Sequence, residues 1–241
     1  MRYSVNAPGH ARRILPGMLW PLRHPVVAIV LGVVAVAVVS AAGFLLVKKD
    51  AVTQWDLSID QWLSDHHASF LNTIAHGIYT AFSPVEAIAI TAVLTVIIFL
   101  VGKNWRAAGT FALTIAITWL PSDALKILVD RPRPLASALA NPFLPTPPDP
   151  SYPSGHMVFA ASLAFTFIFM ARGTRAMPWA ILGGIVGVLL VAFALMYLGV
   201  HYPTDVAASI LWSAGTVPAF LAIWDNYVVP RTYRKQDLVV D

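Results

Sequence analysis

The sequence predicts an all-α integral membrane protein with six transmembrane helices and one further amphipathic helical element on the extracytoplasmic side. Of its 241 residues, 58% are hydrophobic and only 12% are charged, whereas a soluble domain carries about 25% charged residues. The charged residues also cluster, so that long uncharged stretches lie between them. Cysteine is absent, which excludes a disulfide framework, a thiolate nucleophile and a thiolate metal site.

Six apolar segments approach the roughly 20 residues that a helix needs to cross the hydrocarbon core of a bilayer. They span residues 25–47, 84–102, 107–128, 156–171, 179–200 and 204–224, of which the fourth is short. A cleaved signal peptide is the alternative for the first segment, but this segment is long for a signal-peptide core. We therefore expect a membrane domain over 25–225, a cytoplasmic segment over 1–24 and a cytoplasmic tail over 226–241.

The basic residues orient these segments, because cytoplasmic loops of membrane proteins are enriched in lysine and arginine. With the N-terminus in the cytoplasm, the inner side holds Arg2, Arg12, Arg13, Arg23, Lys103, Arg106, Arg172, Arg175, Arg231, Arg234 and Lys235. The outer side then holds Lys48, Lys49, Lys126, Arg131 and Arg133. A net charge of +4 is compatible with nucleic-acid binding, but basic residues beside apolar segments favour a topology signal. We expect the bilayer, and no nucleic acid, as the partner, with both termini in the cytoplasm.

The region between the first two spans, residues 51–83, carries apolar side chains at helical spacing, among them Trp55 and Trp62. Asp56 and Asp60 occupy the opposite positions. This pattern predicts one or two amphipathic helices. They lie either on the outer membrane surface, with tryptophans at headgroup depth, or packed against the spans.

A proline-rich segment, 126–156, joins spans three and four. Eight of the 18 prolines lie within 129–155, which prevents a regular helix and predicts an outer loop. Polar residues unusual for a membrane protein gather in 126–134, 153–156 and 199–205. Since all three groups lie at the outer ends of predicted spans, we expect them to converge on one outward-facing site.

The first two groups suit a phosphate. Lys126 and Arg133 supply positive charge, and guanidinium geometry favours bidentate contact with phosphate oxygens. Ser154 and Gly155 precede a helix start, where free N–H groups bind anions and glycine permits close approach. The alternative for the basic residues is that they anchor a span at the level of the headgroups.

The third group adds candidate catalytic side chains. His201 and Asp205 are four residues apart, a spacing that can place a carboxylate beside an imidazole and leave one ring nitrogen free to attack. His156, from another span, is available to protonate a leaving group. A structural hydrogen bond or half of a metal site are alternatives for His201 and Asp205. Few further metal ligands are present, and we expect no metal and no cofactor.

Taken together, the three groups form an ordered set of motifs. They read Lys126-x6-Arg133-Pro134, Pro153-Ser154-Gly155-His156 and His201-x3-Asp205. This set resembles the type-2 phosphatidic acid phosphatase family of integral membrane lipid phosphatases. The resemblance extends over residues from about 50 to 225 and includes the six-span layout.

The resemblance implies a role for each motif residue. His201 would be the nucleophile that forms a phosphohistidine, and Asp205 would orient its ring. His156 would be the general acid toward the lipid leaving group and then the base for water. The phosphoryl oxygens would be held by Lys126, Arg133, Ser154 and the Gly155 backbone. The family works without a metal, and positioning with dispersed positive charge is what phosphoryl transfer needs.

One position departs from the family pattern. The third motif usually begins Ser-Arg, but the corresponding residues here are Ala194 and Leu195. Losing one charge-assisted contact of this kind costs roughly 2–4 kcal/mol of transition-state stabilisation. Arg131 in the outer loop is a possible auxiliary phosphate ligand that would substitute for the missing arginine.

The expected function is metal-independent dephosphorylation of a membrane lipid at the extracytoplasmic face. The substrate classes are polyprenyl phosphates or diphosphates, phosphatidic acid and phosphatidylglycerol phosphate. Because of Leu195, two alternatives stay open: a lipid phosphotransferase that uses an acceptor alcohol, and a weakened or inactive lipid-phosphate binder.

Overall fold

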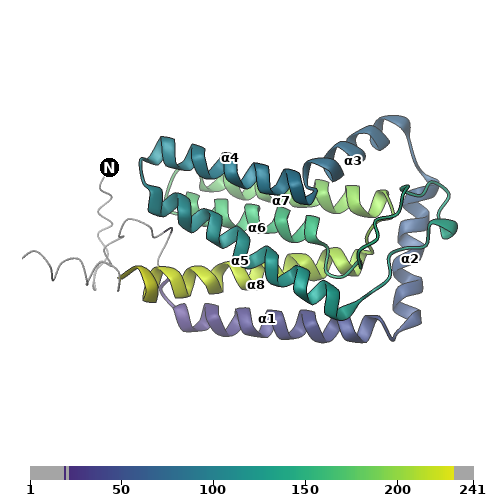
Figure 1. The fold of residues 1–241 in the computed structure, drawn as a ribbon, viewed down its shortest axis with the longest axis horizontal. Helices are drawn as coiled ribbons and strands as arrows, with labels where there is room; N and C mark the ends of the chain where they lie inside the picture. Colours follow the sequence, from purple (N-terminus) through teal and green to yellow (C-terminus); the bar gives the residue numbers. More distant parts are fainter. Residues whose placement is uncertain (1–18, 20–21, 231–241) are drawn as a thin grey trace, which may run out of the picture.

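The computed structural model describes residue 19 and residues 22–230, and the described part is all-helical, without a strand (Figure 1). The helices are α1 (Pro25–Leu46), α2 (Asp50–Asp65), α3 (Ser69–Ala81), α4 (Pro84–Gly102), α5 (Trp105–Val129), α6 (Gly155–Ala171), α7 (Met177–Tyr197) and α8 (Pro203–Ile223). Short elements add a 3-10 turn, η1 (Ala136–Ala138), and a π-helical extension of α8, η2 (Trp224–Val228). The predicted all-α class is confirmed for the described residues.

Six of these helices, α1 and α4–α8, run side by side as an antiparallel bundle, and α2 lies across one end (Figure 1). Five of the six are long and apolar enough to cross a membrane, whereas α6 has 17 residues and falls short of that length. Their bounds agree with the predicted spans to within a few residues, and α4 coincides with its prediction. The last span continues beyond its predicted end, through the π-helix to Val228.

Local sequence signals begin and end these helices. Proline stands in the first turn of α1, α4 and α8, where its missing N–H has no intrahelical acceptor anyway. At the α4–α5 turn, Lys103 adopts a left-handed conformation with φ of 50°, and the Asn104 side chain accepts the N–H groups of Arg106 and Ala107. Asn104 is therefore the N-cap of α5.

The first and last helices pack closely, because small residues line their crossing. A Cβ added to Gly32 of α1 would collide with Ala219 of α8, and one added to Gly215 of α8 would collide with Ala35. Glycine at both positions lets the two backbones approach, as in many membrane helix pairs. Trp212 then ties α8 to α5 by donating its Nε1–H to the Thr118 carbonyl at 2.8 Å.

The element between the first two spans forms two helices, α2 and α3, of which α2 packs on the end of the bundle. Its buried face is polar: Asp56 and Asp60 have no exposed surface, while Trp55 and Trp62 are 57% and 60% exposed. The helix α2 thus packs on the bundle with its acidic face turned inward, and its two tryptophans stay exposed. For Asp56 the reason is a buried cation of the bundle, described below, with which it forms an ion pair.

The loop over 130–154 has little regular structure, and hydrogen bonds to several helices hold it in place. Tyr152 donates its hydroxyl to the Val39 carbonyl of α1 at 2.6 Å. Gln61 and Ser64 of α2 bind the carbonyl of Ala138 and the amide of Asn141. The loop is therefore fixed between α1 and α2 at the end of the bundle that α2 covers.

The basic residues that predicted the orientation lie partly outside the described residues. Lys103, Arg172 and Arg175 lie in the α4–α5 and α6–α7 connections and Arg106 lies in the first turn of α5, all at the end of the bundle opposite α2. Outside the described residues are Arg2, Arg12, Arg13, Arg231, Arg234 and Lys235, with most of the predicted segments 1–24 and 226–241.

Candidate active site

The three predicted motif segments meet at the α2 end of the bundle, where α5 ends and α6 and α8 begin (Figure 1). The His156 and His201 rings lie with their centroids 6.3 Å apart. His201 is completely buried and His156 is 9% exposed. The structure thus brings the two candidate catalytic histidines, which are 45 positions apart in the sequence, into one small space.

His201 lies in the turn between α7 and α8 and contacts a guanidinium. Its Nε2 is 3.1 Å from Nη1 of Arg133. Because a guanidinium only donates, Nε2 accepts and is unprotonated, which leaves the proton on Nδ1. Burial lowers the pKa of His201 well below its usual value, and the charges of Arg133 and Lys126 lower it further. The neutral ring therefore keeps a lone pair on the nitrogen that faces the basic residues.

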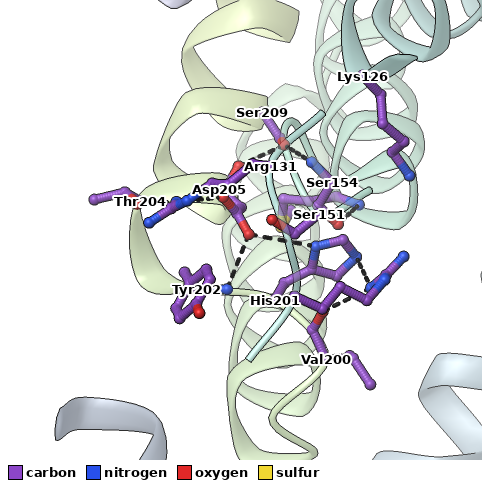
Figure 2. Close-up of polar contacts among 12 residues, drawn as sticks. Lys126, Arg131, Ser151, Ser154, Val200, His201, Tyr202, Thr204, Asp205 and Ser209 are labelled. Carbon is purple, nitrogen blue, oxygen red and sulfur yellow. Dashed lines mark hydrogen bonds and ion pairs between the residues drawn. The ribbon is translucent and has the colours of Figure 1, made fainter. Parts of the chain in front are cut away.

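Asp205 lies behind the His201 ring, in the first turn of α8 (Figure 2). Its Oδ2 is 3.7 Å from His201 Nδ1, beyond ordinary hydrogen-bond distance, and accepts the Tyr202 N–H at 3.0 Å. Its Oδ1 accepts from Arg131 at 2.6 Å. The structure thus places the Asp205 carboxylate beside the neutral His201 ring, as predicted, but without a hydrogen bond between them.

Arg131 is buried on the far side of Asp205 from His201. It is 1% exposed and forms ion pairs with Asp205 at 2.6 Å and with Asp56 of α2 at 2.8 Å. Thr204 joins the cluster by donating its hydroxyl to Asp56, and the Tyr202 ring lies under the guanidinium, 4.3 Å from its centre. Burial works against the charge of Arg131, but the two carboxylates outweigh it and raise its pKa.

This location differs from the predicted one. The sequence made Arg131 a possible auxiliary phosphate ligand, whereas the structure commits both of its terminal nitrogens to carboxylates. Asp56 and Thr204 are the partners that sequence reasoning missed. The signal for Asp56 was its place on the polar face of a helical pattern, but its partner is 75 residues away.

Lys126 and Arg133 lie close together and share one carboxylate. Asp149 of the loop accepts from Lys126 Nζ at 2.7 Å and from Arg133 Nη2 at 2.8 Å. Arg133 also donates from Nε to the Asp149 carbonyl and from Nη1 to the Val200 carbonyl. The two cations that the sequence assigned to phosphate are therefore brought together as predicted, together with an aspartate that the sequence did not single out.

The start of α6 faces the same space. Ser154 is the N-cap, with its side chain accepting the Met157 N–H at 3.3 Å, and its own N–H donates to Ser209 Oγ at 2.9 Å. A Cβ added to Gly155 would lie 3.3 Å from Asp123 Oδ1 and 3.8 Å from Lys126 Nζ. Glycine therefore keeps the helix N-terminus, with its free N–H groups, directly beside Lys126.

His156 is held by stacking on Tyr79 of α3. The two rings lie 4.4 Å apart at 22°, and His156 Nε2 has no hydrogen-bond partner among the described residues. Burial raises the pKa of Tyr79, so that this ring is a neutral phenol at neutral pH. Tyr79 is a further residue of the site that the sequence did not reveal.

Leu195, where the resemblance places an arginine, is 1% exposed and belongs to an apolar cluster with Met157, Tyr197 and Val200. Its carbonyl accepts the Val200 N–H at 3.1 Å, one residue before His201. The Leu195 carbonyl thus stabilises the backbone of the turn that carries His201, and the Leu195 side chain adds no charge to the site. Within residues 22–230, no group of three His, Asp or Glu side chains is arranged to hold a metal ion.

These features define an all-helical integral membrane protein with a buried histidine–carboxylate centre at one end of its bundle. The chain belongs to the PAP2 superfamily, whose family model matches residues 103–228, and the resemblance of the motifs to this family is confirmed.

Two relatives and one solved structure are similar to this chain. An undecaprenyl-diphosphatase of Sulfolobus acidocaldarius is 30% identical over 52% of this chain and 59% of its own length. Undecaprenyl-diphosphatase BcrC of Bacillus subtilis is 30% identical over 61% of this chain and 71% of its own. The crystal structure of a transmembrane PAP2-type phosphatidylglycerolphosphate phosphatase from Bacillus subtilis has the same fold. It superposes with a TM-score of 0.64 at 21% identity, covering 89% of this chain and 98% of that one.

Proposed function

We propose that the protein removes phosphate from a membrane lipid phosphate or diphosphate through a phosphohistidine formed on His201. The observation that carries this proposal is the position of His201 Nε2, unprotonated and 3.1 Å from Arg133. A phosphoryl group bound by Arg133 would therefore lie against the ring nitrogen. His156 is available across a gap of 6.3 Å between ring centroids.

The proposed reaction has two steps. His201 Nε2 attacks phosphorus, the bond from phosphorus to the leaving-group oxygen breaks, and protonated His156 gives its proton to that oxygen. His156 then takes a proton from water, whose oxygen attacks the phosphorus. The bond between phosphorus and His201 Nε2 breaks, so that inorganic phosphate leaves and the free His201 ring is restored. Lys126 and Arg133 stabilise the charge on the phosphoryl oxygens in both steps. Asp205 stabilises the positive charge that the His201 ring gains.

The proposed substrate class is a polyprenyl diphosphate, with phosphatidylglycerol phosphate and phosphatidic acid as further candidates. Support comes from the names of the two 30%-identical relatives, both undecaprenyl-diphosphatases. The solved phosphatidylglycerolphosphate phosphatase shares the fold at lower identity.

We also propose six membrane spans, with both termini and the α4–α5 and α6–α7 connections in the cytoplasm. The 17 residues of α6 extend about 26 Å at 1.5 Å per residue, near the roughly 30 Å of a bilayer core, and α6 lies within the bundle (Figure 1). The described basic residues of those two connections support this orientation. The site then faces the extracytoplasmic leaflet.

An apolar cavity supports a lipid substrate. A space of about 630 Å³ lies along α6 and α7, lined by small and apolar side chains that include Ala160, Gly183 and Gly187. Its lining also includes Phe82, which follows the helix that carries Tyr79. The lining begins at Ala160, one helical turn from His156, and extends along α6 to Thr174 at the other end of the bundle. We propose that the hydrocarbon chain of the substrate lies in this cavity.

A lipid phosphotransferase is the second candidate, and Leu195 is the observation that favours it. Without the usual arginine, the site has one positive charge fewer to stabilise the phosphoryl group. An enzyme that holds the phosphohistidine until an acceptor alcohol arrives tolerates slower attack by water than a hydrolase does.

The experiment is phosphate release in detergent with a chelator present. Polyprenyl diphosphate, phosphatidic acid and phosphatidylglycerol phosphate are compared, with and without an added acceptor lipid. His201→Ala should abolish release. The control is His66→Ala, at the exposed C-cap of α2, where the histidine contacts the carbonyl and the ring of Trp62; it should leave release unchanged. Release that requires the acceptor would select the phosphotransferase. Release by His201→Ala within about tenfold of wild type would refute the nucleophile assignment.

A further inference from the structure

The carboxylate of Asp149 occupies both cations of the proposed phosphate site. Its Oδ2 is 2.7 Å from Lys126 Nζ and its Oδ1 is 2.8 Å from Arg133 Nη2. Each oxygen of one carboxylate thus binds one cation, which is the bidentate arrangement that a phosphoryl group would adopt. Any phosphate that reaches Lys126 and Arg133 must exchange with Asp149 or share the cations with it.

The three side chains differ in how firmly they are held. Lys126 and Arg133 have side chains only 10% and 5% exposed, whereas the Asp149 side chain is 47% exposed. Asp149 also lies among Pro147, Pro148 and Pro150, residues without an N–H to bind the rest of the protein. The cations are therefore fixed parts of the bundle, and the carboxylate is the accessible and exchangeable member.

The charge balance also shows that Asp149 is bound as an anion. Partial burial acts to raise its pKa, but hydrogen bonds and charge from Lys126 and Arg133 outweigh burial and hold the pKa well below its usual range. Asp149 is therefore charged at neutral pH, where a phosphate ester is ionised as well. It would compete with a bound phosphate as an anion and would repel one that did not displace it.

We propose that Asp149 is a built-in competitor for the phosphate site, which makes the protein select diphosphate over monophosphate lipids. This inference rests on the proposed function of Lys126 and Arg133. A monophosphate replaces two carboxylate contacts with two of its own and gains little. A diphosphate carries more negative charge and a second phosphoryl group, which can bind one cation while the first binds the other, so that it displaces the carboxylate more readily.

The test uses Asp149→Asn in the full-length protein, with inorganic phosphate as the probe. Asparagine keeps the size of the side chain and the Asp149 carbonyl that accepts from Arg133 Nε at 2.9 Å, but it removes the charge. Affinity for inorganic phosphate, measured by thermal stabilisation in detergent at low salt, should rise about threefold to tenfold, the effect of losing two partly exposed ion pairs. The ratio of KM for a monophosphate lipid to KM for the matching diphosphate lipid should fall.

Two further variants make the result decisive. Asp65→Asn removes an exposed charge from α2 at the same end of the bundle and should leave phosphate affinity within twofold of wild type. Asp149→Glu retains the charge and should keep the wild-type affinity and KM ratio even if it shifts the melting temperature. Unchanged or weaker phosphate affinity in Asp149→Asn, or the same change in Asp149→Glu, would overturn the proposal. Since phosphate affinity is read without turnover, a failure of the proposed reaction is a separate result.

Discussion

Replacing Arg131 with methionine should destabilise the protein more than any other single change in the charged network. Arg131 is 1% exposed, and its two ion-pair partners, Asp56 and Asp205, have no exposed surface. Methionine fills similar volume but leaves two buried carboxylates without a cation. Removing one partner of a buried ion pair lowers the free energy of unfolding by about 3–5 kcal/mol. Here both carboxylates lose the same guanidinium. We expect a loss of at least the lower end of that range.

The measurement is the free energy of unfolding in mixed micelles, with the double variant Arg131→Met/Asp56→Asn as the informative comparison. Removing the Asp56 charge takes away one of the two uncompensated carboxylates, so that the double variant should be more stable than Arg131→Met alone. A free energy of unfolding within about 1 kcal/mol of wild type for Arg131→Met would refute the reasoning. A double variant less stable than the single one would refute it as well, because destabilisation would then come from lost packing and not from charge.

Three other predictions concern the cavity, the buried acid and the histidine turn. Gly187→Leu adds a side chain to open space in the apolar cavity and should raise KM for long-chain but not short-chain lipid phosphates. The control Gly109→Leu, in open space on α5, should change neither KM. An equal change in KM for both chain lengths in Gly187→Leu would contradict the cavity assignment. Burial, followed by the charges of neighbouring carboxylates, raises the pKa of Asp60 from 3.8 to about 9. The folded state therefore holds a proton that the unfolded state releases, and the free energy of unfolding falls as pH rises between these values, by at most about 1.4 kcal/mol per pH unit. Asp60→Asn should flatten this dependence, and an unaltered pH–stability curve would argue against a neutral Asp60. Gly199 has φ of 62° and a Cβ there would collide with Leu139, so Gly199→Ala should lower stability by about 1–3 kcal/mol, and a melting temperature equal to wild type would contradict the strain.

The spans were predictable from the sequence because the membrane imposes one simple requirement, a long uncharged segment. The helix bounds of α4, for example, follow from Pro84 at its start and Lys103 at its end. The motif residues at the ends of the spans were predictable for a related reason. Placing a charged or imidazole side chain in or beside a membrane segment costs free energy, so its presence there indicates a functional role.

The partners of those residues were not predictable, because they come from distant segments whose local patterns have ordinary explanations. Asp56 belongs to a regular amphipathic pattern, and nothing in that pattern indicates which face turns toward Arg131. Asp149 lies in a proline-rich loop whose path only the fold determines. The motif distinguished Arg133 from Arg131, but no local pattern indicates that Arg131 turns to two buried carboxylates. The structure assigns Arg133 to His201 and Arg131 to the carboxylates.

The close packing of the first helix against the last has a consequence for the order in which the chain can fold. Thr204, in the first turn of α8, contacts Asp56 across 148 residues, and Gly32 of α1 lies against α8. Closing so long a loop is slow. A nascent chain that has reached the end of α7 already contains Arg133 and His156 but lacks His201 and Asp205. The proposed catalytic centre is therefore incomplete until the final span is inserted, and a chain truncated before residue 203 would keep the close-packed face of α1 exposed to lipid.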